Sequence, residues 1–366
     1  MNDSAREPFV VIVDDEPDNV QGLAADLHKT LAVQVLEPQE LDEPALREGT
    51  IFLVDLFLTD WPGREELTPG AQVFDGVALA AVIRAHARNA RRPPPIIALN
   101  TGHAGDFSDL PVEIREHAIA RANNLEWVFL KNDSRSSIPT HERVAELAEA
   151  QRRLPRDWRE AAAETDLLEL LGARESELDE ILDAWPPIRE VNTDTAGVAM
   201  LRWLLHRVLP YPCFLLDERH VAVRLGLSCS ALNAAAEGGS KLAEALSRCS
   251  YKGVLAGFDG PRWWRSRIEE MLWELSPSRD LPTTVAALQA LSDVPLERTE
   301  TPNGVVVLDA DYTPRPEPAD VAEAVRIRLD DWPPYAEDAW ASIDDAREDP
   351  RLRDRVLPLD RARLDV

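Results

Sequence analysis

Short apolar runs alternate with amphipathic stretches along the first third of the chain. After Pro17, apolar residues recur at helical spacing as far as Leu27, and a second helical pattern follows Asp75. Strands that alternate with helices are typical of a parallel sheet with helices on both faces. The pattern predicts an open, doubly wound α/β domain with strand order 2-1-3-4-5. The expected strands are residues 9–13, 33–36, 51–55, 95–99 and 127–130.

Charged residues stand at the ends of three of these runs. Asp14 and Asp15 follow the first run, Asp55 closes the third, and Lys131 follows the last. Because the carboxyl ends of parallel strands face the crevice where ligands bind, we expect these side chains at one edge of the sheet. A carboxylate beside a hard cation can attack phosphorus, and a lysine stabilises the charge that develops. The expected Mg2+ ligands are Asp14, Asp15, Asp55 and the backbone carbonyl of Phe57.

Four short pieces carry these residues in a fixed order: residues 11–16 with both aspartates, 54–56 with Asp55, 95–101, and 130–131 with Lys131. Together they make residues 7–137 resemble the receiver domain of bacterial two-component response regulators. The resemblance implies a flavodoxin-like (βα)5 fold and a cytoplasmic phosphorelay protein that uses Mg2+. It also implies that Asp55 accepts a phosphoryl group from a histidine kinase or phosphotransfer protein, and that Lys131 contacts the phosphate. Such a domain is a phosphoacceptor rather than an enzyme, with at most weak autophosphatase activity.

The chain departs from the family pattern next to the proposed site. Receivers usually place a hydroxyl residue directly after the fourth strand, whereas this chain has Asn100 there and Thr101 one place later. Either residue is a candidate for the switch position. An extra loop at 59–75 could cap the site or restrict which kinase reaches it. The alternative is a degenerate receiver that keeps the fold, is not phosphorylated and acts as an interaction scaffold.

Beyond Lys131 the pattern becomes mainly helical. We expect a helical connector at 138–195, opened by a helix from about 140 to 153, and a helical output module containing Trp and Arg at 196–295. Residues 296–366 are expected to form a small acidic region with a strand at 304–309 and a helix at 322–329. The connector helices are compatible with a homodimer, and equally with an ordinary core.

Residues 220–237 have the pattern of a helix-turn-helix, with Gly226 in the turn and Ser228 as the cap of the second helix. A DNA-reading helix should offer Arg, Lys, Asn or Gln to bases and phosphates, and this one offers only Asn233. We therefore expect an output that acts through a downstream protein partner. A DNA-binding transcriptional regulator, paired by dimerisation, is the alternative.

A second concentrated signal is the Trp/Arg stretch at 260–267. The apolar spacing that continues beyond it predicts a helix with Trp264 and Ile268 facing inward. Arg262 and Arg265 would then remain available to a partner, since Trp and Arg dominate interface hot spots.

The overall charge narrows the possible partners. The chain of 366 residues has 66 acidic and 40 basic side chains, a formal net charge of -26. Such a field repels nucleic acid and acidic membrane surfaces, and no apolar run approaches the length of a membrane span. The three cysteines show no CxxC pairing, and the sequence contains no nucleotide-binding glycine loop, HExxH motif or nucleophile elbow. We therefore expect no membrane role and no enzymatic output.

Overall fold

The N-terminal part of the chain is an open parallel sheet. The computed structural model describes residues 7–56, 75–90, 92–102, 110–131, 136–154, 163–188, 196–278, 280–299, 301 and 303–365. The five strands lie in the order β2-β1-β3-β4-β5, which confirms the predicted order, and all neighbours are parallel. They are β1 (Phe9–Val13), β2 (Ala32–Leu36), β3 (Ile51–Val54), β4 (Ile96–Thr101) and β5 (Trp127–Leu130).

Helices cover both faces of this sheet. Because both faces are buried, the central strands are apolar throughout: Val10 and Ile12 of β1 belong to one core, and Val11 and Val13 to the other. The first core receives α1 (Gln21–Leu27) and α5 (Thr140–Arg153), which also contact each other. The second core receives α2 (Glu43–Glu48), α3 (Gly76–Asn89) and α4 (Val112–Ala122).

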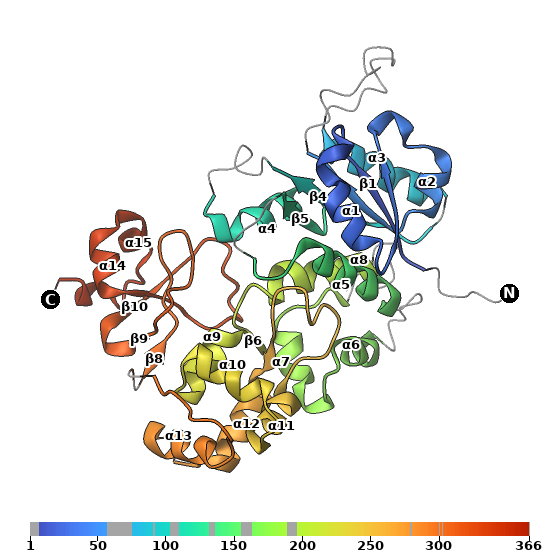
Figure 1. The fold of residues 1–366 in the computed structure, drawn as a ribbon. Helices are drawn as coiled ribbons and strands as arrows, with labels where there is room; N and C mark the ends of the chain where they lie inside the picture. Colours follow the sequence, from blue (N-terminus) through green and yellow to red (C-terminus); the bar gives the residue numbers. More distant parts are fainter. Residues whose placement is uncertain are drawn as a thin grey trace.

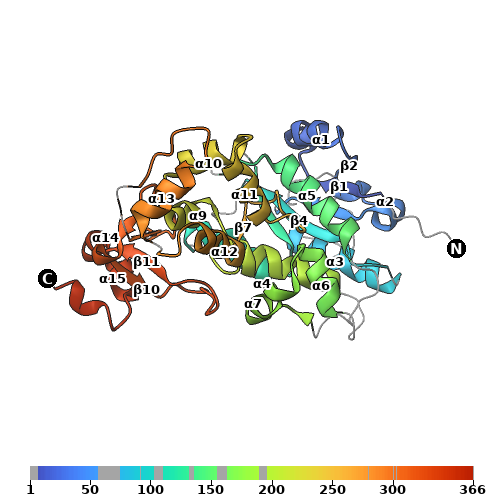
Figure 2. The same cartoon turned by 90° about the horizontal axis from the view of Figure 1, so that it is seen from below.

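The first core continues beyond the sheet into the helices that follow. It takes in residues of α6 (Ala163–Leu171), α7 (Leu178–Asp183), α8 (Ala196–Trp203) and the π-helical segment Leu204–Val208. Figures 1 and 2 show these green and yellow helices between the blue sheet and the red C-terminal part.

The predicted limits of the receiver at 137 and of the connector at 195 remain predictions. Since α5 packs on the sheet, we propose that the receiver-like unit ends near residue 154.

The middle of the chain forms a second helical core. It contains α9 (Glu218–Leu225), α10 (Cys229–Glu237), α11 (Lys241–Cys249), α12 (Arg265–Leu275) and α13 (Leu281–Gln289). A short antiparallel pair, β6 (Leu215–Leu216) and β7 (Trp263–Trp264), lies beside them.

The prediction for the Trp/Arg stretch was correct for the apolar residues and wrong for Arg262, and the guanidinium of Arg265 is also held, by the Glu180 carboxylate at 2.7 Å. Trp264 and Ile268 are fully buried, as predicted. Arg262 is only 8% exposed, and its guanidinium donates to Asp259 and to the carbonyl oxygen of Leu209. The guanidinium completes a buried turn and is not available to a partner.

The described residues of the C-terminal part form two small antiparallel pairs of strands and two α-helices. They are β8 (Gly304–Val305) with β9 (Ala319–Asp320), β10 (Ala324–Ile327) with β11 (Ala339–Ser342), α14 (Ile343–Glu348) and α15 (Pro350–Arg355). The helix predicted at 322–329 is wrong, because a 3-10 turn ends at Glu323 and β10 covers residues 324–327. Val325 and Ile327 are buried while Arg326 and Arg328 are not, which is the period of two expected of a strand. Across the described residues, no helix has the length and apolar character needed to cross a bilayer.

Candidate functional site

Four of the predicted site residues meet at the carboxyl edge of the sheet. The ammonium nitrogen of Lys131 lies 2.8 Å from Asp14 Oδ2 and 2.7 Å from Asp55 Oδ2. One carboxylate oxygen from each of Asp14, Asp15 and Asp55 lies within 4.8 Å of the others. The sequence predicted this edge because each charge follows a buried strand, and the parallel order β1, β3 and β5 brings those strand ends to the same side.

Backbone hydrogen bonds hold these residues one position beyond their strands. The N–H of Asp55 donates to the carbonyl of Val13 at 2.9 Å, and the N–H of Lys131 donates to the carbonyl of Thr101 at 2.8 Å. Oδ1 of Asp55 accepts the N–H of Leu56 at 2.6 Å. The sheet ladder therefore continues into the site and fixes the direction of the side chains.

Sequence reasoning missed the role of Gly76, the first residue of α3. A Cβ atom there would lie 2.0 Å from the carbonyl oxygen of Asp55, so only glycine allows α3 to begin against the site. The signal was present as a glycine directly after Asp75, whose side chain caps the helix by accepting the N–H of Ala78.

Burial and charge set the ionisation of the site. Asp14 is 1% exposed, and its burial raises its pKa; the neighbouring Asp55 charge acts in the same direction, while Lys131 opposes both. Burial alone would lower the pKa of Lys131, but its contacts with the carboxylates of Asp14 and Asp55 outweigh this effect and raise the pKa. Lys131 is therefore a protonated ammonium at neutral pH.

The donor set fits a magnesium ion. Oδ2 of Asp14 is buried and lies at ion-pair distance from Lys131. It accepts no hydrogen bond from any described residue, so it keeps a lone pair that can bind a cation. Among the described residues, the carboxylates of Asp14, Asp15 and Asp55 gather at one point, and clustered carboxylate oxygens are the ligands that a hard divalent cation prefers. Asp14, Asp15 and Asp55 would hold it. The predicted fourth ligand, the carbonyl of Phe57, and most of the 59–75 loop lie outside the described residues.

The two candidate switch residues occupy different places. β4 extends through Thr101, so both residues are part of the strand rather than following it. Val54 pairs with Leu99, and the next position of β4, Asn100, therefore stands beside Asp55. Thr101 is fully buried and pairs with Leu130; because side chains alternate along a strand, it faces the opposite side of the sheet from Asn100. The structure brings Asn100 to the site and directs Thr101 away from it.

A buried aromatic and histidine cluster joins the sheet unit to the later helices. His117 of α4 and His206 of the π-helical segment lie with their Nδ1 atoms 3.2 Å apart. The His206 ring stacks on Trp127 of β5 at 5.7 Å between centroids, and the Arg143 guanidinium of α5 lies 4.7 Å from the Trp127 ring centroid. Burial lowers the pKa of His117 well below its ordinary value and that of His206 to about 3. Sequence reasoning missed this cluster, because its members are far apart in the chain.

A fully buried carboxylate, Glu126, makes a second connection between the same parts. It accepts the N–H of Ile97 at 2.6 Å, and it pairs with Arg84 of α3 at 2.9 Å and with Arg202 of α8 at 2.8 Å. Such a charge is tolerated in a core only because every oxygen is paired. The carboxylate ties α8 to the end of the sheet opposite the acidic site.

Comparisons with known proteins give structural likenesses only. No protein-family model matches the chain, and no curated protein matches it. Two RcsB dimers bound to two parallel DNAs match with a TM-score of 0.26 and 16% identity, over 55% of this chain and 98% of the other. RcsB from Salmonella enterica serovar Typhimurium, bound to promoter rprA with phosphomimetic BeF3-, matches with a TM-score of 0.24 and 19% identity, over 53% of this chain and 92% of the other. The complex of the CheA3 P1 domain with CheY6 from R. sphaeroides matches with a TM-score of 0.24 and 17% identity, over 40% of this chain and 95% of the other.

TM-scores this low do not by themselves establish a shared fold. The N-terminal unit is receiver-like on two other grounds: its strand order β2-β1-β3-β4-β5, and the acidic cluster of Asp14, Asp15 and Asp55 at the carboxyl edge of that sheet. The sequence pattern predicts both features.

Proposed function

We propose that the chain is a response-regulator-like signalling protein whose phosphoacceptor is Asp55. The phosphoryl donor would be a histidine kinase or phosphotransfer protein, and Mg2+ would be held by Asp14, Asp15 and Asp55, with the carbonyl of Phe57 as a further ligand. One observation carries the proposal: a single lysine reaches two carboxylates from different strands, at 2.7 and 2.8 Å, within the acidic cluster.

The chemistry follows from these contacts. One carboxylate oxygen of Asp55 forms a P–O bond as the P–N bond of the phosphohistidine breaks, and the imidazole leaves with the electron pair. Lys131 offsets the charge that develops on the phosphoryl oxygens, since it stays protonated at neutral pH. Bound Mg2+ supplies further charge neutralisation. Asn100, beside Asp55 in the strand register, could donate its amide N–H to the phosphoryl group in place of the usual hydroxyl.

For the output we propose contact with a downstream protein rather than DNA. The second helix of a helix-turn-helix reads DNA with its N-terminal residues, and here the start of α10 is covered by Glu297. The N–H of Ser228 donates to the carbonyl of Glu297, and the Ser228 hydroxyl lies 2.9 Å from the Glu297 carboxylate. Asn233 is held by Glu218 at 2.9 Å. Carboxylates at both positions repel a phosphate backbone, so this geometry supports the protein-interaction output.

Intact mass after incubation with acetyl phosphate and Mg2+ tests the proposal. Wild type should gain one phosphoryl group, and Asp55→Asn should gain none. Asp18→Asn is the matched control, because it makes the same chemical change at an exposed position near the same edge and should label like wild type. Absence of added mass on folded wild type would refute phosphorylation and leave the degenerate receiver, acting as a scaffold, as the better account.

A further inference from the structure

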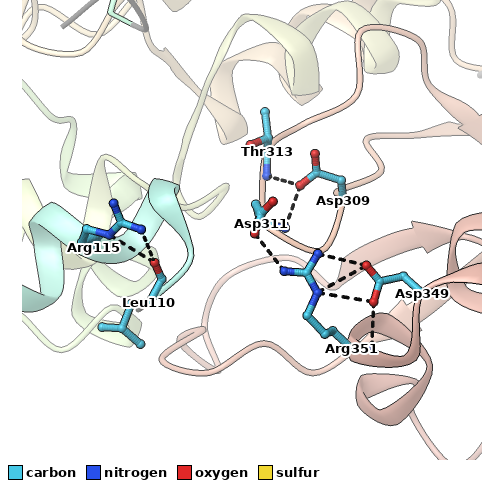
Figure 3. A network of polar contacts seen from close by, with 7 residues as sticks. All are labelled: Leu110, Arg115, Asp309, Asp311, Thr313, Asp349 and Arg351. Carbon is cyan, nitrogen blue, oxygen red and sulfur yellow. Dashed lines mark hydrogen bonds and ion pairs between the residues drawn. The ribbon is translucent and has the colours of Figure 1, made fainter. Parts of the chain in front are cut away.

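A large groove lies between α4 and the C-terminal part, away from the acidic site. Its volume is about 970 Å³, and its walls come from Leu110, Pro111 and Arg115 at the start of α4 and from residues 310–311, 328–332, 351, 354–358 and 361 on the other side. Figure 3 shows the two walls, with Arg115 on one ribbon and Arg351 with Asp311 on the other. The groove lies within the size range of sites for small ligands.

The charge of the groove differs from that of the chain. Five arginines and four aspartates line it, in a protein whose net charge is -26. Three of the aspartates already have arginine partners: Asp311 pairs with Arg351, Asp330 with Arg355, and Asp331 with Arg121 and Arg207 from outside the lining. Of the lining aspartates, only Asp354 has no such partner among the described residues.

Three arginines of the groove have no carboxylate partner within the described part of the chain. Arg115 donates to the carbonyl of Leu110, and Arg361 donates to the carbonyl of Val356. Arg328 is exposed, and its guanidinium forms no hydrogen bond or ion pair with a described residue. Each guanidinium has N–H donors to spare. Three guanidinium groups from three separate segments therefore line one groove without a carboxylate partner among the described residues, against one unpaired carboxylate, that of Asp354.

The floor of the groove is built to keep its shape. Asp331 adopts a left-handed backbone conformation, with φ of 67°, and its carboxylate is held by Arg121 of α4 and by Arg207 of the π-helical segment. The neighbouring Trp332 donates its indole N–H to the carbonyl of Glu337 at 2.8 Å. Strain at a residue that two cations hold in place is typical of binding sites.

We propose that this groove binds a nucleoside polyphosphate. Guanidinium groups recognise phosphoryl oxygens through charge-assisted hydrogen bonds, and three of them on separate segments can hold more than one phosphoryl group. Trp332 and Leu357, which are partly exposed, offer a surface for the base and sugar. The proposal does not depend on phosphorylation of Asp55, because no residue of the acidic site lines the groove.

Calorimetric titration of the full chain with ATP and with inorganic pyrophosphate tests this site, in magnesium-free buffer so that Asp14, Asp15 and Asp55 do not contribute. Both should bind, ATP more tightly, and added salt should weaken both. Arg328→Ala and Arg361→Ala should each weaken ATP binding by about tenfold, the value of one charge-assisted contact.

Arg353→Ala is the matched control, since it removes the same charge from exposed α15 outside the groove and should leave ATP binding unchanged. Asp55→Asn should also bind ATP like wild type, which separates this test from that of phosphorylation. Neither Arg328 nor Arg361 forms an ion pair among the described residues, so the variants should fold. Three results would overturn the proposal: no binding of either probe, an equal loss in Arg353→Ala, or tighter binding of a polyglutamate peptide than of ATP.

Discussion

Acidification should weaken the connection between α4 and the π-helical segment, because His206 is buried, His117 is half-buried beside it, and both are uncharged at neutral pH. The pKa of His206 is lowered to about 3 by burial, and that of His117 is lowered well below its ordinary value for the same reason. A group whose pKa is depressed in the folded state stabilises the fold above its unfolded pKa of 6.5, and this contribution is lost as the pH falls below that value. For His206 alone, the loss between pH 7 and pH 5 is about 2 kcal/mol.

Urea unfolding of wild type and His206→Asn at pH 7, 6 and 5 measures this contribution. Asp14 and Glu180 have pKa values raised chiefly by burial, so they favour the folded state as the pH falls and partly mask the histidines in wild type. The difference between the two proteins removes that effect: the variant should lose about 2 kcal/mol less than wild type between pH 7 and pH 5. His28→Asn, at an exposed position, should keep the wild-type pH dependence. An identical pH dependence in His206→Asn and wild type would refute the reasoning.

Three further substitutions test the geometry around the site. Gly76→Ala places a Cβ against the carbonyl oxygen of Asp55 and should lower the unfolding free energy by about 1–3 kcal/mol. Gly22→Ala is the control, because its Cβ meets open space in α1, and it should raise the unfolding free energy by about 0.5–1 kcal/mol. Equal effects of the two substitutions would contradict the close approach at Gly76. Glu126→Gln removes the fully buried charge that pairs two partly buried arginines and should cost about 3–5 kcal/mol by urea unfolding. A loss below about 1 kcal/mol would show that the pairs contribute little. Lys131→Met should slow labelling of Asp55 by acetyl phosphate by about 100-fold, and an unchanged rate would exclude Lys131 from the chemistry.

The sheet could be predicted from the sequence because its strands are buried on both faces. Apolar runs such as 51–54 have no polar alternation, and the charged residue that ends each run marks the carboxyl edge. The placement of Asp14, Asp55 and Lys131 within ion-pair reach follows from strand order alone. The length of β4 could not be read in the same way, because Asn100 and Thr101 are polar residues that the pairing with β5 includes in the strand.

Long-range pairing decided the features that the sequence did not reveal. The segment at 322–329 has the Ala, Glu and Val content of a helix, but pairing of β10 with β11 buries Val325 and Ile327 on one face and gives a strand. Arg262 resembles a solvent-exposed interface residue until the carbonyl of Leu209, 53 residues away, accepts its N–H. Local propensity carries no information on such partners.

The continuous core constrains how a signal at Asp55 could reach the rest of the chain. Trp127 and Phe129 of β5 pack in the same cluster as Leu204 and Phe258, so the strand that ends at Lys131 is also a wall of the helical region. Close-packed side chains transmit a displacement that a flexible linker would absorb. A phosphoryl group that draws Lys131 away from Asp14 would therefore act on β5 and, through its aromatic side chains, on the π-helical segment. If Asp55 is phosphorylated as proposed, we expect a change in packing at α4 and the π-helical segment, where His117 and His206 meet, and not a separation of domains.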